Sequence, residues 1–173
     1  MMDGAAGRMR YMSVESAMTK EVITVNASDK IACVWLLLMD KDISGAPVVD
    51  NQGMFVGVLS VTDINRAIMD RARKAGAVHD ASCEASTDPE VQRQRLRSMA
   101  EAMRAVSDSP VSAIIPTTQV PHVLGPFDSL DRAIKLMAEF SVNRLPVVKD
   151  GHVVGIISRQ DIIWLFAGRP RQG

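Results

Sequence analysis

Two stretches of this 173-residue chain decide its fold: APVVDNQGMFVGVLSVTDI at residues 46–64 and LPVVKDGHVVGIISRQDII at residues 145–163. Both contain a Pro-Val-Val run, a Val-Gly pair and then Ser-x-x-Asp-Ile, and the second has one residue fewer in its turn. Self-similarity of this kind indicates a repeated supersecondary unit. We therefore expect two copies of one structural unit in the chain.

The same elements are expected in each copy. A short extended piece and a helix precede Pro-Val-Val; Ser28 or Asp29 is expected to cap this helix in the first copy, and Asp128 or Ser129 in the second. Two strands joined by a Gly-containing turn then predict a hairpin, and a second helix follows it. The predicted fold class is α/β (α+β), with two β-α-β-β-α repeats packed as a pseudo-symmetric pair.

The two copies divide the chain into five segments. Residues 14–76 and 111–167 hold the copies, residues 77–110 link them, and residues 1–13 and 168–173 form the tails.

The linker is expected to contain a helix of its own. Asp88 and Pro89 have the residue types of a helix N-cap and a first helical position. Four apolar residues follow at helical spacing, with arginines on the opposite side: Leu96, Met99, Met103 and Val106. We expect an inserted amphipathic helix that docks on the module or on a partner subunit.

Composition limits the function. Twenty basic and twenty acidic side chains give a formal net charge of zero, which argues against a protein whose main task is to coat nucleic acid. The longest apolar run, residues 31–39, is about half of what a membrane span needs. Two cysteines without a CxxC pattern, and no signal-peptide pattern at the start, predict a cytoplasmic protein with no membrane partner.

Signatures of catalysis are absent from the sequence. It contains no GxSxG, GxxxxGK[ST], GxGxxG or HExxH motif, and its three histidines are scattered among expected loops and turns. We therefore predict no catalytic residues and no metal site.

The repeated Ser-x-x-Asp motif, Ser60 to Asp63 and Ser158 to Asp161, has two interpretations. Each motif lies where a strand is expected to lead into a helix, whose free N–H groups suit a phosphate, and an aspartate there can accept both hydroxyls of a ribose. Alternatively, Ser and Asp at this spacing form a capping box, and a repeated fold repeats its caps. The residues alone leave both interpretations open.

The pattern of Pro-Val-Val, turn, Val-Gly and Ser-x-x-Asp-Ile, present twice, resembles a tandem pair of cystathionine-β-synthase (CBS) domains, also called a Bateman module. The resemblance covers about residues 14–75 and 111–167. It implies regulatory binding of an adenosine-containing ligand (AMP, ADP, ATP, S-adenosylmethionine or NAD) in clefts between the two motifs. It also implies a homodimer. Because the two copies leave room for no effector domain in this sequence, we expect the output to be a separate effector protein or the dimer itself. We expect no prosthetic group, and Mg²⁺ only as a companion of ATP.

The resemblance assigns ligand contacts to matching positions. Ribose hydroxyls would be held by Asp63 and Asp161. Phosphate would be approached by Ser60, Thr62 and Ser158. The cleft would be lined by Ser44, Gly45, Asn143 and Arg144. The base would be contacted, largely through backbone, by Thr19, Ile23 and Thr24. All these residues stand at the matching places of this chain.

The two copies differ in charge. Arg144 stands where the first copy has Gly45, and Arg159 stands where it has Val61. We expect unequal clefts, with phosphate favoured where Arg144 or Arg159 projects.

Two other functions remain open. One is a ligand-free scaffold that acts by dimerisation or by docking through the inserted helix. The other is nucleic-acid binding, which only the arginines of residues 92–104 support, whereas the neutral charge and the single tyrosine argue against it.

Overall fold

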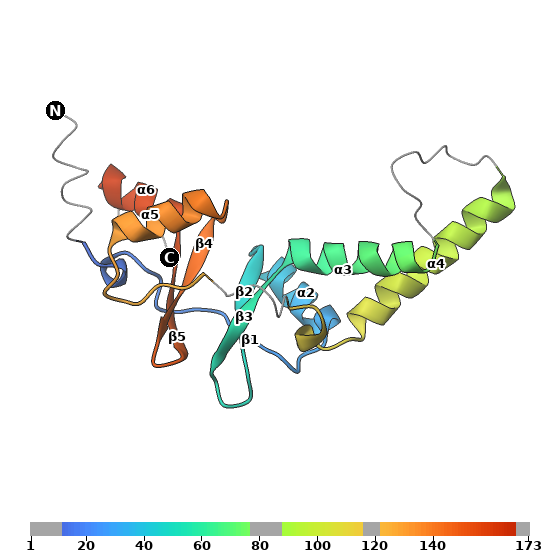
Figure 1. Cartoon of the computed structure of the whole chain (residues 1–173), viewed down its shortest axis with the longest axis horizontal. Helices are drawn as coiled ribbons and strands as arrows, with labels where there is room; N and C mark the ends of the chain where they lie inside the picture. Colours follow the sequence, from blue (N-terminus) through green and yellow to red (C-terminus); the bar gives the residue numbers. More distant parts are fainter. Residues whose placement is uncertain (1–11, 77–87, 116–121, 169–173) are drawn as a thin grey trace. The chain divides into compact units, whose positions relative to one another are not determined.

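The computed structural model describes residues 12–76, 88–115 and 122–168, which gather into two compact units (Figure 1). The N-terminal unit comprises residues 24–51, 56–76 and 88–115; the C-terminal unit comprises residues 12–23, 52–55 and 122–168. The elements are, in chain order, η1 (Val14–Ser16), β1 (Val25–Asn26), α2 (Ile31–Asp40), β2 (Gly45–Val49), β3 (Phe55–Ser60), α3 (Val61–Lys74), α4 (Pro89–Ser107), η2 (Val111–Ala113), α5 (Leu130–Glu139), β4 (Arg144–Lys149), β5 (His152–Ser158) and α6 (Arg159–Ala167). This mixed content confirms the predicted α+β fold class.

A small sheet organises the N-terminal unit. β2 is its central strand, with β3 on one side and β1 on the other; β1 runs parallel to β2 and places Val25 opposite Val48. A parallel pair needs a crossover connection, and α2 supplies it. The buried core combines apolar residues of the sheet and of the helices packed on it: Val25, Ile31, Leu38, Val48, Leu59 and Ile64.

The C-terminal unit is built on an antiparallel hairpin of β4 and β5, with one irregularity between Val147 and Val148. Isolated bridges add one residue at each edge: Leu124 pairs in parallel with Val147, and Thr19 pairs antiparallel with Ile156. The extended piece expected before α5 is thus reduced to a single bridge. The segment beside β5 comes from the first sequence repeat.

Each unit contains a short helical turn from the other repeat. Val14 of η1 is fully buried in the C-terminal unit, where its N–H donates to Asp128 O at 2.8 Å. Val111 of η2 is fully buried in the N-terminal unit, and its N–H donates to Asp29 O at 2.9 Å. Each compact unit therefore contains residues of both sequence repeats, and its boundaries differ from those of the repeats.

The glycine shared by both repeats makes room for these exchanged segments. A Cβ on Gly57 would lie 2.9 Å from Ile115 Cγ2, and a Cβ on Gly155 would overlap the Met18 thioether. Met18 and Ile115 each follow the exchanged turn of their own segment. A methyl group at either position would force the Ile115 or the Met18 side chain to move.

The ends of the helices agree only partly with the expected caps. Ser129 caps α5, since its Oγ accepts from Arg132 N at 3.2 Å. The prediction of Ser28 or Asp29 as the cap of α2 is wrong. The N-cap is Lys30, which makes no side-chain cap bond, and Asp29 instead accepts from Asn26 N at 2.8 Å. Ser28 and Asp29 therefore stabilise the turn that precedes the helix and do not cap it.

The inserted helix α4 begins as predicted, with Asp88 accepting from Glu90 N at 2.8 Å and Pro89 in the first turn. Its predicted apolar face is wrong in part, because Leu96 and Met103 are 71% and 48% exposed. The residues that face inward are Ser98, Met99, Ala102 and Val106. The small Ala102 side chain packs on the fully buried Ala72 of α3, so the side of α4 that contains Ala102 is the buried one.

Within the described ranges, no helix combines the length and the apolar character that crossing a bilayer requires.

A glycine substitution tests the exchanged segment. Gly155→Ala should lower the free energy of unfolding by about 1–3 kcal/mol, because the new methyl group displaces Met18. Met18→Ala in the same chain should recover part of that loss, as measured by urea unfolding. The matched control is Gly125→Ala, whose Cβ would have its nearest neighbour at 3.7 Å. Equal losses for Gly155→Ala with and without Met18→Ala would contradict the packing described.

Candidate functional site

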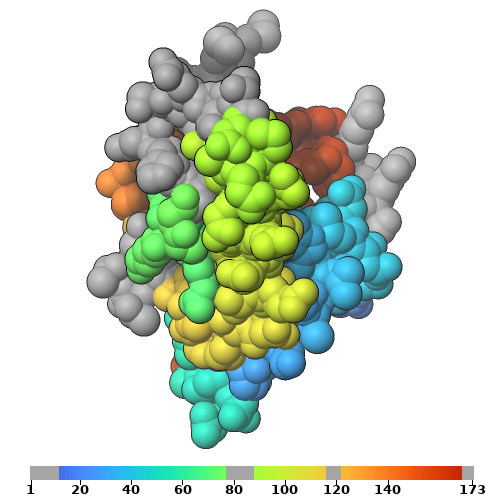
Figure 2. Space-filling model, turned by 90° about the vertical axis from the view of Figure 1, so that its right-hand side faces the viewer, coloured from blue at the N-terminus to red at the C-terminus, as the bar shows by residue number. Residues whose placement is uncertain are grey.

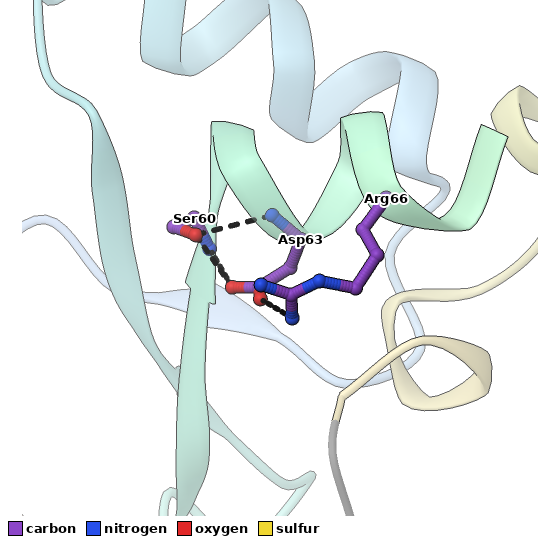
Figure 3. A network of polar contacts seen from close by, with 3 residues as sticks. All are labelled: Ser60, Asp63 and Arg66. Atoms are coloured by element: carbon purple, nitrogen blue, oxygen red, sulfur yellow. Dashed lines mark hydrogen bonds and ion pairs between the residues drawn. The ribbon is translucent and has the colours of Figure 1, made fainter. Parts of the chain in front are cut away.

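Both Ser-x-x-Asp motifs form capping boxes at a strand-to-helix junction. Ser60 Oγ accepts from Asp63 N at 3.2 Å, and Asp63 Oδ2 accepts from Ser60 N at 3.0 Å and from Ser60 Oγ at 2.5 Å (Figure 3). Ser158 and Asp161 repeat the pattern. Ser158 Oγ accepts from Asp161 N at 3.2 Å, and Asp161 Oδ2 accepts from Ser158 N and from Ser158 Oγ, each at 2.7 Å. The capping interpretation is therefore confirmed for both motifs. It also fixes a hydroxyl and a carboxylate at each junction.

The two aspartates have different surroundings. Asp63 Oδ1 accepts from Arg66 Nη1 at 3.2 Å, so the guanidinium lies beside the carboxylate (Figure 3). Asp161 is only 7% exposed. Arg66 therefore already uses one acceptor position of the Asp63 carboxylate.

A second repeated bond brings the segment before each proline to the same junction. Val61 N donates to Ser44 O at 3.0 Å, and Arg159 N donates to Asn143 O at 2.9 Å. The predicted cleft residues of each copy are thus gathered around one helix N-terminus, in the N-terminal unit for the first copy and in the C-terminal unit for the second. The first group is Ser44, Gly45, Ser60, Thr62 and Asp63, and the second is Asn143, Arg144, Ser158, Arg159 and Asp161.

Steric constraint accounts for the difference between Gly45 and Arg144. A Cβ on Gly45 would lie 2.7 Å from Leu59 O, so the first junction excludes any larger residue without backbone movement. In the second junction Arg144 pairs opposite Ser158 and places a long cationic side chain at the corresponding position. The two sites therefore have different charge.

Thr19 lies at the second-copy site, although it belongs to the first sequence repeat. Thr19 N donates to Ile156 O at 2.8 Å, and Ile156 N donates to Thr19 O at 2.9 Å, so Thr19 lies along β5 two residues from Ser158. Thr19 Oγ1 and Arg144 Nε are buried and have no hydrogen-bond partner among the described residues. Buried polar atoms without partners are costly and call for an explanation.

The other predicted contacts are less clearly placed at a site. Ile23 and Thr24 are exposed in the extended segment before β1, and no hydrogen bond of the described part ties them to a capping box. Arg159 Nη2 donates to Met137 O at 2.9 Å, so this guanidinium already supports the end of α5.

Sequence reasoning missed one candidate. Arg159 N and Asp161 N both have acceptors, whereas Gln160 N, between them, has none among the described residues. An N–H without an acceptor in the first turn of a helix can donate to a ligand oxygen. The sequence does contain a signal for it, because Gln160 aligns with Thr62, a predicted phosphate contact of the first copy.

Two further observations concern other kinds of site. No group of three or more His, Cys, Asp or Glu residues in the described part is arranged to hold a metal ion. A hollow of about 330 Å³ between α3 and α4 is lined by Gly76, Glu90, Val91 and Ser98 among others, and none of the predicted ligand residues lines it.

The capping boxes predict a loss of stability that is independent of any ligand. Asp161→Ala should lower the free energy of unfolding by about 1–2 kcal/mol, because the Ser158 N–H and hydroxyl lose their acceptor. Asp161→Asn retains an acceptor oxygen and should lower it less. Asp70→Ala, which removes an exposed partner of Arg73, is the control and should change it by under about 0.5 kcal/mol. Urea unfolding measures all three, and equal values for Asp161→Ala and Asp70→Ala would rule out the capping role.

Comparison with known proteins shows the family and the fold of this chain. The CBS domain family model matches residues 14–70 and 106–168. The uncharacterised protein MJ1426 of Methanocaldococcus jannaschii is 28% identical over 153 residues, which cover 88% of this chain and 89% of that protein. Two solved structures share the fold. CBSX2 in complex with AMP has a TM-score of 0.64 at 23% identity, covering 90% of this chain and 96% of that one. The CBS domain pair of MJ0100, in complex with 5′-methylthioadenosine and S-adenosyl-L-methionine, has a TM-score of 0.61 at 22% identity, covering 91% and 97%. This chain, with two matched regions, belongs to the CBS domain family as a tandem pair.

Proposed function

We propose that this CBS pair is a regulatory module that binds an adenosine-containing ligand and changes its shape or its partner on binding. The observation that carries the proposal is the junction in the C-terminal unit. There Ser158 and Asp161 form the N-terminus of α6, Arg144 pairs opposite Ser158, and Thr19 pairs opposite Ile156. Thr19 Oγ1 and Arg144 Nε are buried without a partner among the described residues. The complexes of CBSX2 with AMP and of MJ0100 with S-adenosyl-L-methionine support this class of ligand.

Each group at the junction suits one part of such a ligand. The Asp161 carboxylate accepts hydrogen bonds, as a ribose diol requires, and the α6 N-terminus offers the Gln160 N–H toward a phosphate. Arg144 supplies a cationic group for the same phosphate, and the first-copy site has no counterpart because Gly45 stands there. We expect the C-terminal site to prefer a phosphorylated ligand and the N-terminal site to bind it more weakly.

Regulation follows from a difference in affinity between two arrangements of the module, since a ligand that binds both equally shifts neither. The output goes to a separate effector protein in the cytoplasm, and the module acts as a homodimer. Mg²⁺ accompanies the ligand only if the ligand is ATP. No catalytic role is assigned to any residue.

Ligand binding is tested first by thermal shift and isothermal titration with AMP, ADP, ATP, NAD, S-adenosylmethionine and GMP as the non-adenine control. A ligand at 100 times its dissociation constant should add about 2.7 kcal/mol, which raises Tm by several degrees. We expect adenine ligands to do so and GMP not to. A Tm that no adenine ligand changes, with self-association intact, would favour the ligand-free scaffold instead.

An arginine variant tests the phosphate contact. Arg144→Ala should weaken AMP binding about tenfold to a hundredfold and leave adenosine binding unchanged, because a charge-assisted hydrogen bond to the phosphate is lost. Arg132→Ala, which removes an exposed partner of Asp128 in the same unit, is the matched control and should change neither. Equal losses for AMP and adenosine in Arg144→Ala would contradict the phosphate contact.

A further inference from the structure

The hollow of about 330 Å³ in the N-terminal unit lies where α3 ends and α4 begins. The two helices pack against each other, and Figure 2 shows them side by side. The hollow is lined by residues that follow α3 and by residues from the first turns of α4: Ala75 and Gly76, then Glu90, Val91, Gln94, Arg95 and Ser98. Its volume is at the lower end of the range for ligand pockets, so it suits a small molecule.

Ser98 is the residue of this hollow that its fold does not explain. It is only 7% exposed, and its hydroxyl makes no hydrogen bond with any described residue. A serine in or next to a helix can donate to the carbonyl four residues before it, as Ser109 does to Ala105 O at 2.7 Å, but Ser98 makes no such bond. A buried polar group without a partner calls for an explanation. A ligand in the hollow would supply the missing partner.

The ends of the two helices give the hollow opposite polarity on its two sides. α3 ends at Lys74 with carbonyl groups that carry a partial negative charge, and α4 begins at Pro89 with N–H groups that carry a partial positive charge. Asp88 satisfies Glu90 N, whereas Val91 N has no acceptor among the described residues. A ligand with an anionic and a cationic end complements this arrangement.

Charged side chains of both signs also line the hollow. Arg95 contributes a half-buried guanidinium, a group that binds carboxylates well. Glu90 contributes an exposed carboxylate, which also pairs with Arg93 at 3.4 Å. The Ser98 hydroxyl can donate or accept. These groups together are the ones that recognise the carboxylate and the ammonium of a free amino acid.

We propose that this hollow binds a free α-amino acid with an aliphatic side chain. The ligand carboxylate accepts hydrogen bonds from Ser98 Oγ, Val91 N and the Arg95 guanidinium. The ligand ammonium donates to Glu90 and to the carbonyls that end α3, and the side chain lies on Ala75 and Val91. This inference goes beyond the proposed function, because none of the residues assigned to the adenosine ligand lines the hollow.

Isothermal titration of the full chain with L-alanine, L-valine and L-leucine tests the ligand class. For the amino acid that binds best, the acid without the amino group and the amine without the carboxylate should each bind about tenfold more weakly or worse, because one charged end is lost. Absence of binding by all three amino acids, or an analogue that binds as tightly as its amino acid, overturns the proposal.

Amide NMR spectra locate the ligand. The best-binding amino acid should shift the N–H signals of Gly76 and Val91, which line the hollow, and leave those of Gly155 and Asp161 in the other unit unchanged. Shifts confined to Gly155 and Asp161 would place the amino acid at the adenosine junction and overturn the proposal.

Ser98→Ala separates a binding role from a structural one. It should weaken amino acid binding about fivefold or more, because one hydrogen bond is lost. It should leave the urea midpoint unchanged or higher, since its hydroxyl has no partner to lose within the described part. Ser107→Ala, in the same helix but outside the hollow, is the matched control and should change neither.

Unchanged amino acid affinity in Ser98→Ala overturns the proposal. A lower urea midpoint would give the hydroxyl a partner in the fold and would also contradict it. AMP affinity should be equal in Ser98→Ala and the wild type, so failure of this site and failure of the adenosine site are observed separately.

Discussion

The turn from the second hairpin strand into the following helix is closed in both repeats by a serine and an aspartate three residues apart. The serine hydroxyl accepts from the aspartate N–H, and the aspartate carboxylate accepts from the serine N–H and hydroxyl. The N–H of the residue after the serine donates to the carbonyl of Ser44 in the first repeat and of Asn143 in the second. Helix N-termini carry free N–H groups that must be satisfied or offered to a ligand. This one junction holds strand, helix and hairpin together, and it also creates the candidate site. Under the proposed function, the groups that cap the helix are the same groups that would bind the ligand.

Exchange of segments is what completes each unit. η1 lies with the second repeat and η2 with the first, and Gly155 and Gly57 leave space for the residues that follow these turns. The consequence for function is direct: the C-terminal site contains Thr19 from one end of the chain and Asp161 from the other. The ligand of the proposed function would therefore contact residues from two distant parts of the sequence at once.

Repetition of the fold does not make the two sites equal. The first junction has Gly45 because the backbone of Leu59 and Ser60 comes too close for a side chain, whereas the second accommodates Arg144. The helices differ as well: α2 is apolar around most of its surface, whereas its counterpart α5 is amphipathic. The same pattern of strands and helices thus gives a more cationic junction in the second repeat and a more apolar first helix in the first repeat.

The sequence by itself determined the two repeats, the hairpins, the α4 start at Asp88 and the Ser-x-x-Asp junctions, because these depend on turn residues, caps and periodicity within a few neighbouring residues. It did not identify the α2 cap or the buried face of α4. Asp29 is used by the preceding turn, and close packing of Ala102 on Ala72 left Leu96 exposed. Only the tertiary structure decided that Thr19 joins the second-copy site, since pairing with Ile156 is a contact between residues far apart in the chain. Caps and turns depend on interactions between residues close in sequence. The segment that pairs with a strand edge depends instead on the packing of the whole fold.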